Sequence, residues 1–83
     1  MKLKNNVVVT KLEDVWVAYD GEEEMLYEFN EVGGKILNLI QEGVGKMDEI
    51  VEEIVKEFEV SESQAEEDVR EFLEKMEVEG LVK

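Results

Sequence analysis

Residues 25–40 have the sequence MLYEFNEVGGKILNLI, and the spacing of their apolar residues changes partway along. From Met25 to Phe29 every second side chain is apolar, which is typical of a strand with one half-buried face. Asn30 is a preferred helix N-cap, and from Val32 the apolar residues recur at a spacing of about 3.6, on one stripe of a helix. We therefore expect strands before this junction and helices after it.

The length and composition indicate one small globular domain. The chain has 83 residues, which we expect to form a single domain over residues 1–83, and 43% of them are hydrophobic at periodic positions. It has no cysteine, so nothing indicates disulfides or an oxidising compartment. No run approaches the roughly 20 apolar residues of a membrane span, and the first residues lack an apolar signal segment. We expect a cytoplasmic protein without a membrane partner.

The net charge is the strongest compositional signal. The chain has 9 Lys and Arg against 23 Asp and Glu, formally −14 at pH 7. Such a chain repels phosphate backbones and anionic lipid headgroups. Two interpretations remain open: the acidic side chains form a solvated surface that favours solubility, or some of them attract a basic partner.

The first part of the chain is expected to form a three-stranded antiparallel meander, with edges at both outer strands, from the segments Val7–Thr10, Val15–Tyr19 and Met25–Phe29. The polar segment Lys11–Asp14 would be the first turn. Asp20 and Gly21 would supply the positive-φ positions of the second turn, and Glu22–Glu24 would extend its loop.

The second part is expected to form three helices, at Glu31–Glu42, at Met47–Phe58, and from the N-cap Ser61 to Gly80. Gly33 and Gly34 in the first turn of the first helix each cost about 1 kcal/mol relative to Ala, which indicates close packing against the sheet. Ser61 and Gln64 form a capping-box pattern in which Gln64 reaches back to the N-cap. Leu81 and Val82 are expected to return to the core. The fold class is α+β, a winged helix-turn-helix-like βββααα order.

The side chains that most enzymes use are absent. Without His or Cys the chain lacks the commonest general base, nucleophile and transition-metal ligands. The hydroxyl groups of Thr10, Ser61 and Ser63 have no candidate base, and carboxylates at this density on helix surfaces are solvated. We expect no catalytic residue, no metal and no cofactor, and therefore a protein that is not an enzyme.

The winged helix-turn-helix outline raises the question of DNA binding. The recognition helix would be residues 61–80, which contain eight acidic residues against Arg70 and Lys75. Such a helix would be repelled by the phosphate-lined grooves that it has to enter. We expect no nucleic acid partner.

A peptide-binding module is the class that remains. An open sheet edge can accept an extended peptide as an added strand, and Met25–Phe29 is the best candidate edge. With the third helix along that edge, Val69 and Phe72 would offer apolar contact and Asp68 and Lys75 would offer charges, although periodicity alone also allows Val69 and Phe72 to be core residues. Replacing Tyr27 by Pro should abolish binding if its N–H faces the edge.

Three segments resemble the PqqD family. Residues 29–37 are similar to its LN-x-x-G-x-x-I-L segment, residues 47–54 to T-x-x-E-I-x-x-x-L, and residues 60–82 to its ending, V-x(n)-D-V-x-x-F-L-x-x-L-x-x-x-G-L. A hairpin with Trp16, Asp20 and Gly21 also lies where that family has one. The resemblance runs from about Val15 nearly to the end of the chain, and its order and spacing make it specific.

The resemblance implies a RiPP recognition element, a non-catalytic domain that binds the leader segment of a ribosomally synthesised precursor peptide. The domain would present the leader to a modifying enzyme such as a radical SAM protein or a lasso-peptide protease. The leader would add as a strand beside the third strand, in the groove against the third helix. The implied peptide-binding residues are Met25, Leu26, Tyr27, Glu28 and Phe29 on the strand and Asp68, Val69, Phe72 and Lys75 on the helix.

An alternative is a scaffold domain that binds a folded partner enzyme without contacting peptide. The acidity of the chain also predicts a basic leader. The oligomeric state is left open between monomer and homodimer, because an unprotected edge strand also permits self-pairing.

Overall fold

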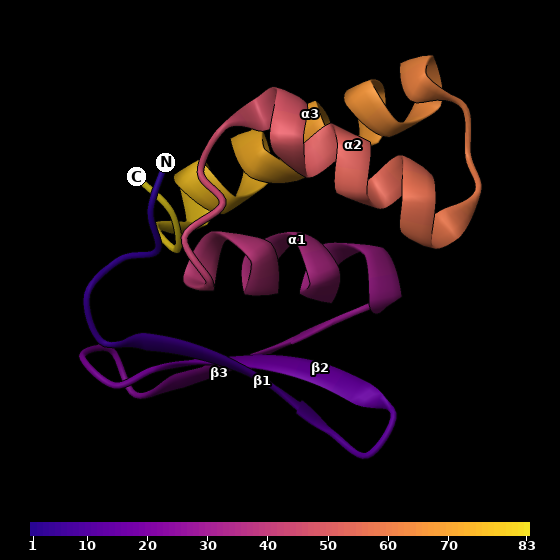
Figure 1. Ribbon diagram of the computed structural model, residues 1–83. Coiled ribbons are helices and arrows are strands. Elements are labelled where there is room, and N and C mark those ends of the chain that lie inside the picture. The colour runs from indigo at the N-terminus through magenta and orange to yellow at the C-terminus, as the bar shows by residue number, and fades with distance from the viewer.

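The computed structural model describes residues 1–83 and has an α+β fold with three antiparallel strands followed by three helices, as the sequence predicts. The elements are β1 (Val7–Leu12), β2 (Val15–Asp20), β3 (Met25–Phe29), α1 (Glu31–Gln41), α2 (Met47–Phe58) and α3 (Glu62–Glu79). Figure 1 shows all three helices on one face of the sheet and none on the other. Each helix is too short or too polar to span a bilayer.

The sheet has the order β1-β2-β3, and its first turn is shorter than the sequence suggested. Lys11 and Leu12 belong to β1 and pair with β2, which leaves Glu13 and Asp14 as a two-residue turn. Lys11 is accommodated in the strand because its ammonium lies 5.7 Å from the centre of the Trp16 ring and 3.2 Å from a carboxylate oxygen of Glu31. The prediction of a turn over Lys11–Asp14 was therefore wrong by two residues.

The second turn also differs from the prediction. Asp20 is the last residue of β2 and pairs with Met25, and the positive φ of the loop falls at Glu24 (55°) and not at Gly21. The Asp20 carboxylate accepts hydrogen bonds from the backbone N–H groups of Glu22 and Glu23 and so forms the first bend of the loop. The chain then reverses at Glu24, where the sequence carries no glycine.

The core lies between the sheet and the helices, with α1 as the middle layer. Helix α1 packs on all three strands on one side and on α2 on the other, and α2 packs on α3. The largest fully buried side chains are Ile36, Leu37, Ile50, Ile54, Leu81 and Val69. The apolar stripes that predicted the helices are thus the surfaces that face one another.

The two glycines at the start of α1 permit two close contacts. A Cβ atom on Gly34 would lie 2.0 Å from Cγ of Trp16 in β2, so α1 could not approach the sheet this closely with any other residue there. A Cβ atom on Gly33 would lie 2.8 Å from Cε1 of Phe72 in α3. Close packing against the sheet is confirmed for Gly34, and Gly33 makes the corresponding contact with α3.

The helix ends largely follow the predicted caps. Oδ1 of Asn30 accepts the N–H of Gly33 at 2.8 Å, and Oγ of Ser61 accepts the N–H of Gln64 at 3.2 Å. The Gln64 side chain does not reach back to the N-cap as predicted, because its amide donates to Asp68 one turn further along α3, at 2.8 Å. Helix α1 ends at Gln41, one residue earlier than predicted.

The chain ends lie side by side (Figure 1). Leu3 pairs with Val82, and Lys2 and Lys83 exchange two backbone hydrogen bonds of 2.9 Å. Leu81 and Val82 are buried, as predicted. The last residues therefore complete the core and fix the segment that leads into β1.

Candidate functional site: the open edge of β3

The outer edge of β1 is covered at its centre by a side chain from α1. The carbonyl of the Gln41 side chain accepts the N–H of Val9 at 2.7 Å, and its amide donates to the C=O of Val9 at 2.8 Å. Both backbone groups of Val9 are therefore used, and both point away from β2. A further strand cannot pair with the centre of this edge without displacing Gln41.

The direction of the Val9 groups fixes the hydrogen-bonding direction of every residue in the sheet. Along an antiparallel strand, the backbone groups of successive residues point alternately to the two sides. Since the N–H and C=O groups of Val9 point away from β2, those of its partner Ala18 point away from β1 and bond to β3. The residue opposite Ala18 in β3 is Tyr27, whose backbone groups are therefore taken up by β2.

The same alternation leaves Leu26 and Glu28 with backbone groups that face outward from β3. No hydrogen bond joins these groups to a loop, a helix or a side chain. The edge of β3 therefore offers two donors and two acceptors to an added strand. The expectation for Tyr27→Pro depended on the Tyr27 N–H facing this edge, and the register shows that it faces β2 instead.

The side chains of β3 divide between the two faces of the sheet. Tyr27 and Phe29 are half-buried against the core, and the exposed Met25 lies on the same face. Leu26 and Glu28 point to the face that no helix covers, and Leu26 is exposed. A strand added at this edge would extend both faces.

Phe29 links the end of β3 to α3. Its ring makes an edge-to-face contact with the ring of Phe72, with centroids 5.8 Å apart, and stacks on Tyr27 at 6.5 Å. Next to this contact lies a hollow of about 420 Å³, which we call the α1–α3 hollow, lined by Asn30, Val32, Gly33, Asp68, Glu71, Phe72 and Lys75. Asn30 directly follows Phe29, so the hollow continues from the C-terminal end of the open edge.

The residues predicted on the third helix fall into two groups. Asp68, Phe72 and Lys75 all line the α1–α3 hollow, with Phe72 half-buried and Lys75 exposed. Val69 is 0% exposed and belongs to the core, where it cannot touch a ligand without rearrangement. Its position supports the helix that carries the other three.

The prediction from sequence did not include Asn30, Val32, Gly33 and Glu71, which complete the hollow. Gly33 carried a signal, since a glycine inside the first turn of a helix indicates a close approach. Glu71 carried none, because it is one of many acidic residues on α3. Gln41 was also missed, since its partner lies 32 residues away in the sequence.

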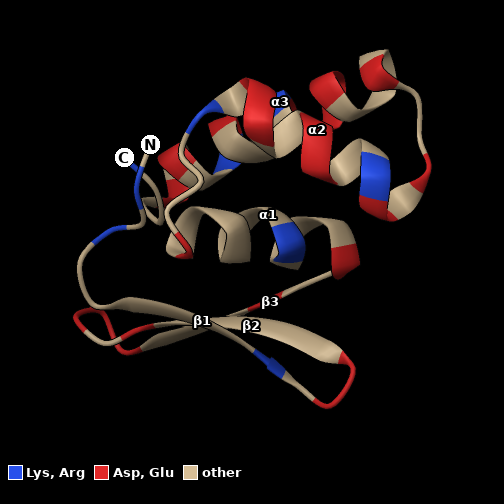
Figure 2. Ribbon diagram, in the orientation of Figure 1, with Lys and Arg blue, Asp and Glu red and all other residues tan.

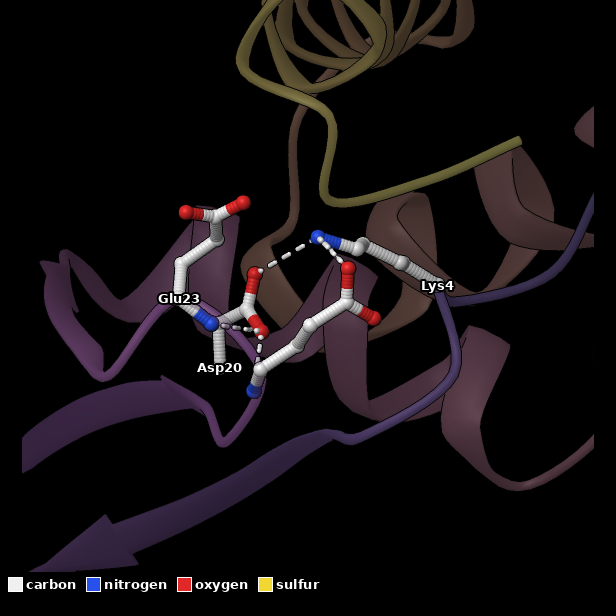
Figure 3. Close-up of polar contacts among 4 residues, drawn as sticks. Lys4, Asp20 and Glu23 are labelled. Atoms are coloured by element: carbon white, nitrogen blue, oxygen red, sulfur yellow. Dashed lines mark hydrogen bonds and ion pairs between the residues drawn. The ribbon is translucent and has the colours of Figure 1, made fainter.

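The loop before β3 is held by a buried carboxylate. Asp20 is 2% exposed and accepts hydrogen bonds from Lys4 Nζ at 3.1 Å and from the N–H groups of Glu22 and Glu23 at 2.9 and 3.2 Å (Figure 3). Burial is the largest single influence and raises the pKa of Asp20, but the hydrogen bonds from Glu23, Lys4 and Glu22 and the positive charge of Lys4 together outweigh it and leave the pKa below its ordinary value. Donation to Asp20 raises the pKa of Lys4.

The surface around the site is acidic. Figure 2 shows Asp and Glu over the helices and in both loops of the sheet, while the strands themselves carry few charges. In the α1–α3 hollow, Asp68 and Glu71 face the single cation Lys75. A second hollow of about 510 Å³, between α1 and α2, is lined by Glu42, Glu49, Glu52 and Glu53 with Lys35, Leu39 and Val44. No group of acidic side chains is arranged to hold a metal ion.

Two solved structures are similar to this one over nearly the whole chain. TbiB1 in complex with the TbiA(beta) leader peptide is 29% identical, with a TM-score of 0.87, and the match covers 100% of this chain and 95% of that one. Lasso peptide synthetase B1 complexed with the leader peptide is 18% identical, with a TM-score of 0.82 and coverage of 99% and 95%. The second comparison supports the fold alone. No curated protein sequence matches the chain.

The comparison with protein families covers most of the sequence. The family described as coenzyme PQQ synthesis protein D (PqqD) matches residues 15–82. The match begins at the first residue of β2 and ends at Val82, so it includes the β3 edge and every residue of the α1–α3 hollow. On this evidence the chain belongs to the PqqD family.

Proposed function

We propose that the chain is a RiPP recognition element, which binds the leader segment of a ribosomally synthesised precursor peptide as a fourth strand beside β3. The observation that carries this proposal is the pair of outward-facing backbone positions, Leu26 and Glu28, at an edge that continues into the α1–α3 hollow. Main-chain hydrogen bonds at such an edge provide affinity, and alternate side chains provide specificity. The other edge is unsuitable because Gln41 covers it.

The comparisons support the same function. The chain belongs to the PqqD family, and TbiB1, at 29% identity, is found in a complex with a leader peptide. The similarity covers the whole of this chain, so β3, α1 and α3 all have counterparts in that protein. The open edge of β3 supplies a surface in this chain to which an extended peptide can bind.

The proposed binding residues have distinct roles. The backbone of the strand Met25–Phe29 aligns the peptide, through the outward groups of Leu26 and Glu28. Peptide side chains on the helix-covered side would lie toward Tyr27 and Phe29 and enter the hollow against Phe72. Asp68 and Lys75 would contact charged groups there, and Val69 supports Phe72 from the core. The carboxylates of Asp68 and Glu71 favour a leader with basic residues at this point.

The proposed role is presentation and not catalysis. The chain has no His and no Cys, and its carboxylates other than the buried Asp20 are partly or fully exposed. Residues 1–83 would act as one cytoplasmic binding domain that delivers the leader to a separate modifying enzyme, such as a radical SAM protein or a lasso-peptide protease. In the alternative, a scaffold role, the chain would bind that enzyme and not the leader.

The test is a matched pair of substitutions at an outward-facing position. Glu28→Pro removes the outward N–H and fills the edge with the proline ring, whereas Glu28→Ala removes only the side chain. Binding of the leader peptide encoded nearest to the gene would be measured by isothermal titration calorimetry. We expect Glu28→Ala to bind within about threefold of the unaltered protein and Glu28→Pro to lose at least about tenfold, which corresponds to 1.4 kcal/mol.

A folded Glu28→Pro variant that bound the leader as tightly as Glu28→Ala would contradict strand addition at β3. If the unaltered protein bound no leader but bound the modifying enzyme, the scaffold role would be correct instead.

A further inference from the structure

The face of the sheet that the helices leave uncovered carries a continuous apolar patch. Five large apolar side chains on it are between 40% and 59% exposed, namely Val8, Leu12, Val15, Tyr19 and Leu26. Most of the large exposed apolar residues of the protein are therefore gathered on one face. Single exposed apolar residues are ordinary in soluble proteins, but a contiguous group indicates a contact surface.

The strand register shows that these side chains are neighbours. Tyr19 is paired with Val8 on one side and with Leu26 on the other, so these three form a row across all strands. Leu12 is paired with Val15 in a second row nearer the first turn. Val17 lies between the two rows and is only 6% exposed, although it does not belong to the main core cluster. We call these six residues the apolar sheet face.

The charged residues that border the apolar sheet face are all acidic, and the uncharged Thr10 lies beside Val17 at the β1 edge. Acidic residues occupy the turn at one end, the loop at the other, and one position on the face itself: Glu13, Asp14, Glu22, Glu23, Glu24 and Glu28. Figure 2 shows both loops with acidic residues and the intervening strands with few charges. Lys11, the one cation of the strands, turns to the other face, where it contacts Trp16 and Glu31.

We propose that the apolar sheet face is the docking surface for the modifying enzyme, and that the enzyme meets it with an apolar patch bordered by Lys and Arg. This inference rests on the proposed function. Charge complementarity selects this occupant: a basic border would be attracted by the acidic one, with fast association at low salt. A second copy of the chain is disfavoured, because two such faces would bring two acidic borders together in molecules of formal charge −14.

The position of the apolar sheet face also suits presentation of the leader to the enzyme. Leu26 and Glu28 contribute side chains to the uncovered face and backbone groups to the open edge of β3. A leader added at that edge would extend the same face by one strand, with every second side chain pointing to the docked enzyme. The enzyme would thus contact the recognition protein and the leader together.

The test uses Tyr19→Arg and Val8→Arg, which place a cation at the centre of the apolar sheet face. Val78→Arg is the matched control, since Val78 is 87% exposed on α3 and far along the chain from the sheet. Each purified variant would be titrated separately with the leader peptide and with the modifying enzyme encoded beside its gene, the latter with and without leader. Exposed positions of this kind are not expected to affect folding, which circular dichroism would verify.

We expect the two face variants to bind the leader within about twofold of the unaltered protein and to lose at least about tenfold in affinity for the enzyme, while Val78→Arg changes neither. Enzyme affinity unchanged by both face variants would overturn the proposal. So would a concentration-dependent dimer in sedimentation that Tyr19→Arg abolishes, because the occupant would then be a second copy. Failure of the proposed function would be seen separately, as absence of leader binding by the unaltered protein, and the leader-free enzyme titration would still decide the docking surface.

Discussion

β1 and β3 are both edge strands of one three-stranded sheet, but the outward backbone groups at the centre of β1 have hydrogen-bond partners and those of β3 do not. At β1, the Gln41 side chain occupies both the N–H and the C=O of Val9. At β3, the outward groups of Leu26 and Glu28 have no partner within the chain. Unpaired edges promote unwanted association, and proteins usually protect them. The proposed addition of a leader strand at β3 requires this difference, because only an edge without an internal partner can accept another strand.

The largest effect is expected from two proline substitutions in β3, one where the backbone N–H faces β2 and one where it faces the open edge. Tyr27→Pro removes an N–H that faces β2 and places the proline ring against that strand, whereas Glu28→Pro alters only the open side. One unsatisfied buried group costs about 1–3 kcal/mol. We expect Tyr27→Pro to lower the free energy of unfolding by more than this cost, and Glu28→Pro to lower it by less than about 1 kcal/mol. Urea unfolding would measure both, and equal losses would show that the assigned backbone directions are wrong.

A smaller effect is expected when the protected edge is opened. Gln41→Met keeps the length of the side chain but leaves both backbone groups of Val9 without a partner. We expect a loss of about 1–2 kcal/mol in stability, together with concentration-dependent self-association at the newly exposed β1 edge. Gln41→Glu, which can still accept from the Val9 N–H, is the control and should lose less. A Gln41→Met variant as stable and as monomeric as the unaltered protein would remove the contrast between the edges.

The sequence predicted the parts of this comparison that depend on local spacing. The strand at 25–29, the helix start at Asn30 and the cap at Ser61 each follow from residues within one turn of one another. The protection of β1 could not be predicted, because Gln41 and Val9 are 32 residues apart and a polar residue at a helix end has many alternatives. The backbone direction of Tyr27 was equally hidden, since it depends on the register of all three strands.

In the candidate site, too, the features that depend on local spacing could be predicted and those that depend on the packing of the helices could not. Phe72, Asp68 and Lys75 share one side of a helix by their spacing alone, and the structure brings them into one hollow. Val69 lies about one turn before Phe72 on the same helix and could be assigned to core or ligand only once the position of the helix was known. Glu24 shows a further limit, since its left-handed conformation is one that its residue type does not favour, and it comes directly after the bend that Asp20 holds at Glu22 and Glu23.

The smallest effect concerns the loop that leads into the open edge, and it depends on pH. The pKa of Asp20 is lower in the folded protein than its ordinary value near 4, so its contribution to stability is present above about pH 4 and is lost as the pH falls through the folded pKa. Asp20→Asn should therefore lower the urea midpoint at pH 7 and have a diminishing effect below about pH 4. A difference between the two proteins that stayed constant from pH 7 to pH 3 would contradict this role.

Amide hydrogen exchange with and without leader peptide is the measurement that tests the open edge most directly. In the free protein, the amides of Leu26 and Glu28 should exchange quickly, while those of Tyr27 and Val9 are protected by β2 and by Gln41. With saturating leader we predict strong protection of Leu26 and Glu28 and little change at Val9. A leader that binds and leaves Leu26 and Glu28 exchanging as fast as before would contradict the account, because the peptide would then not be paired with β3.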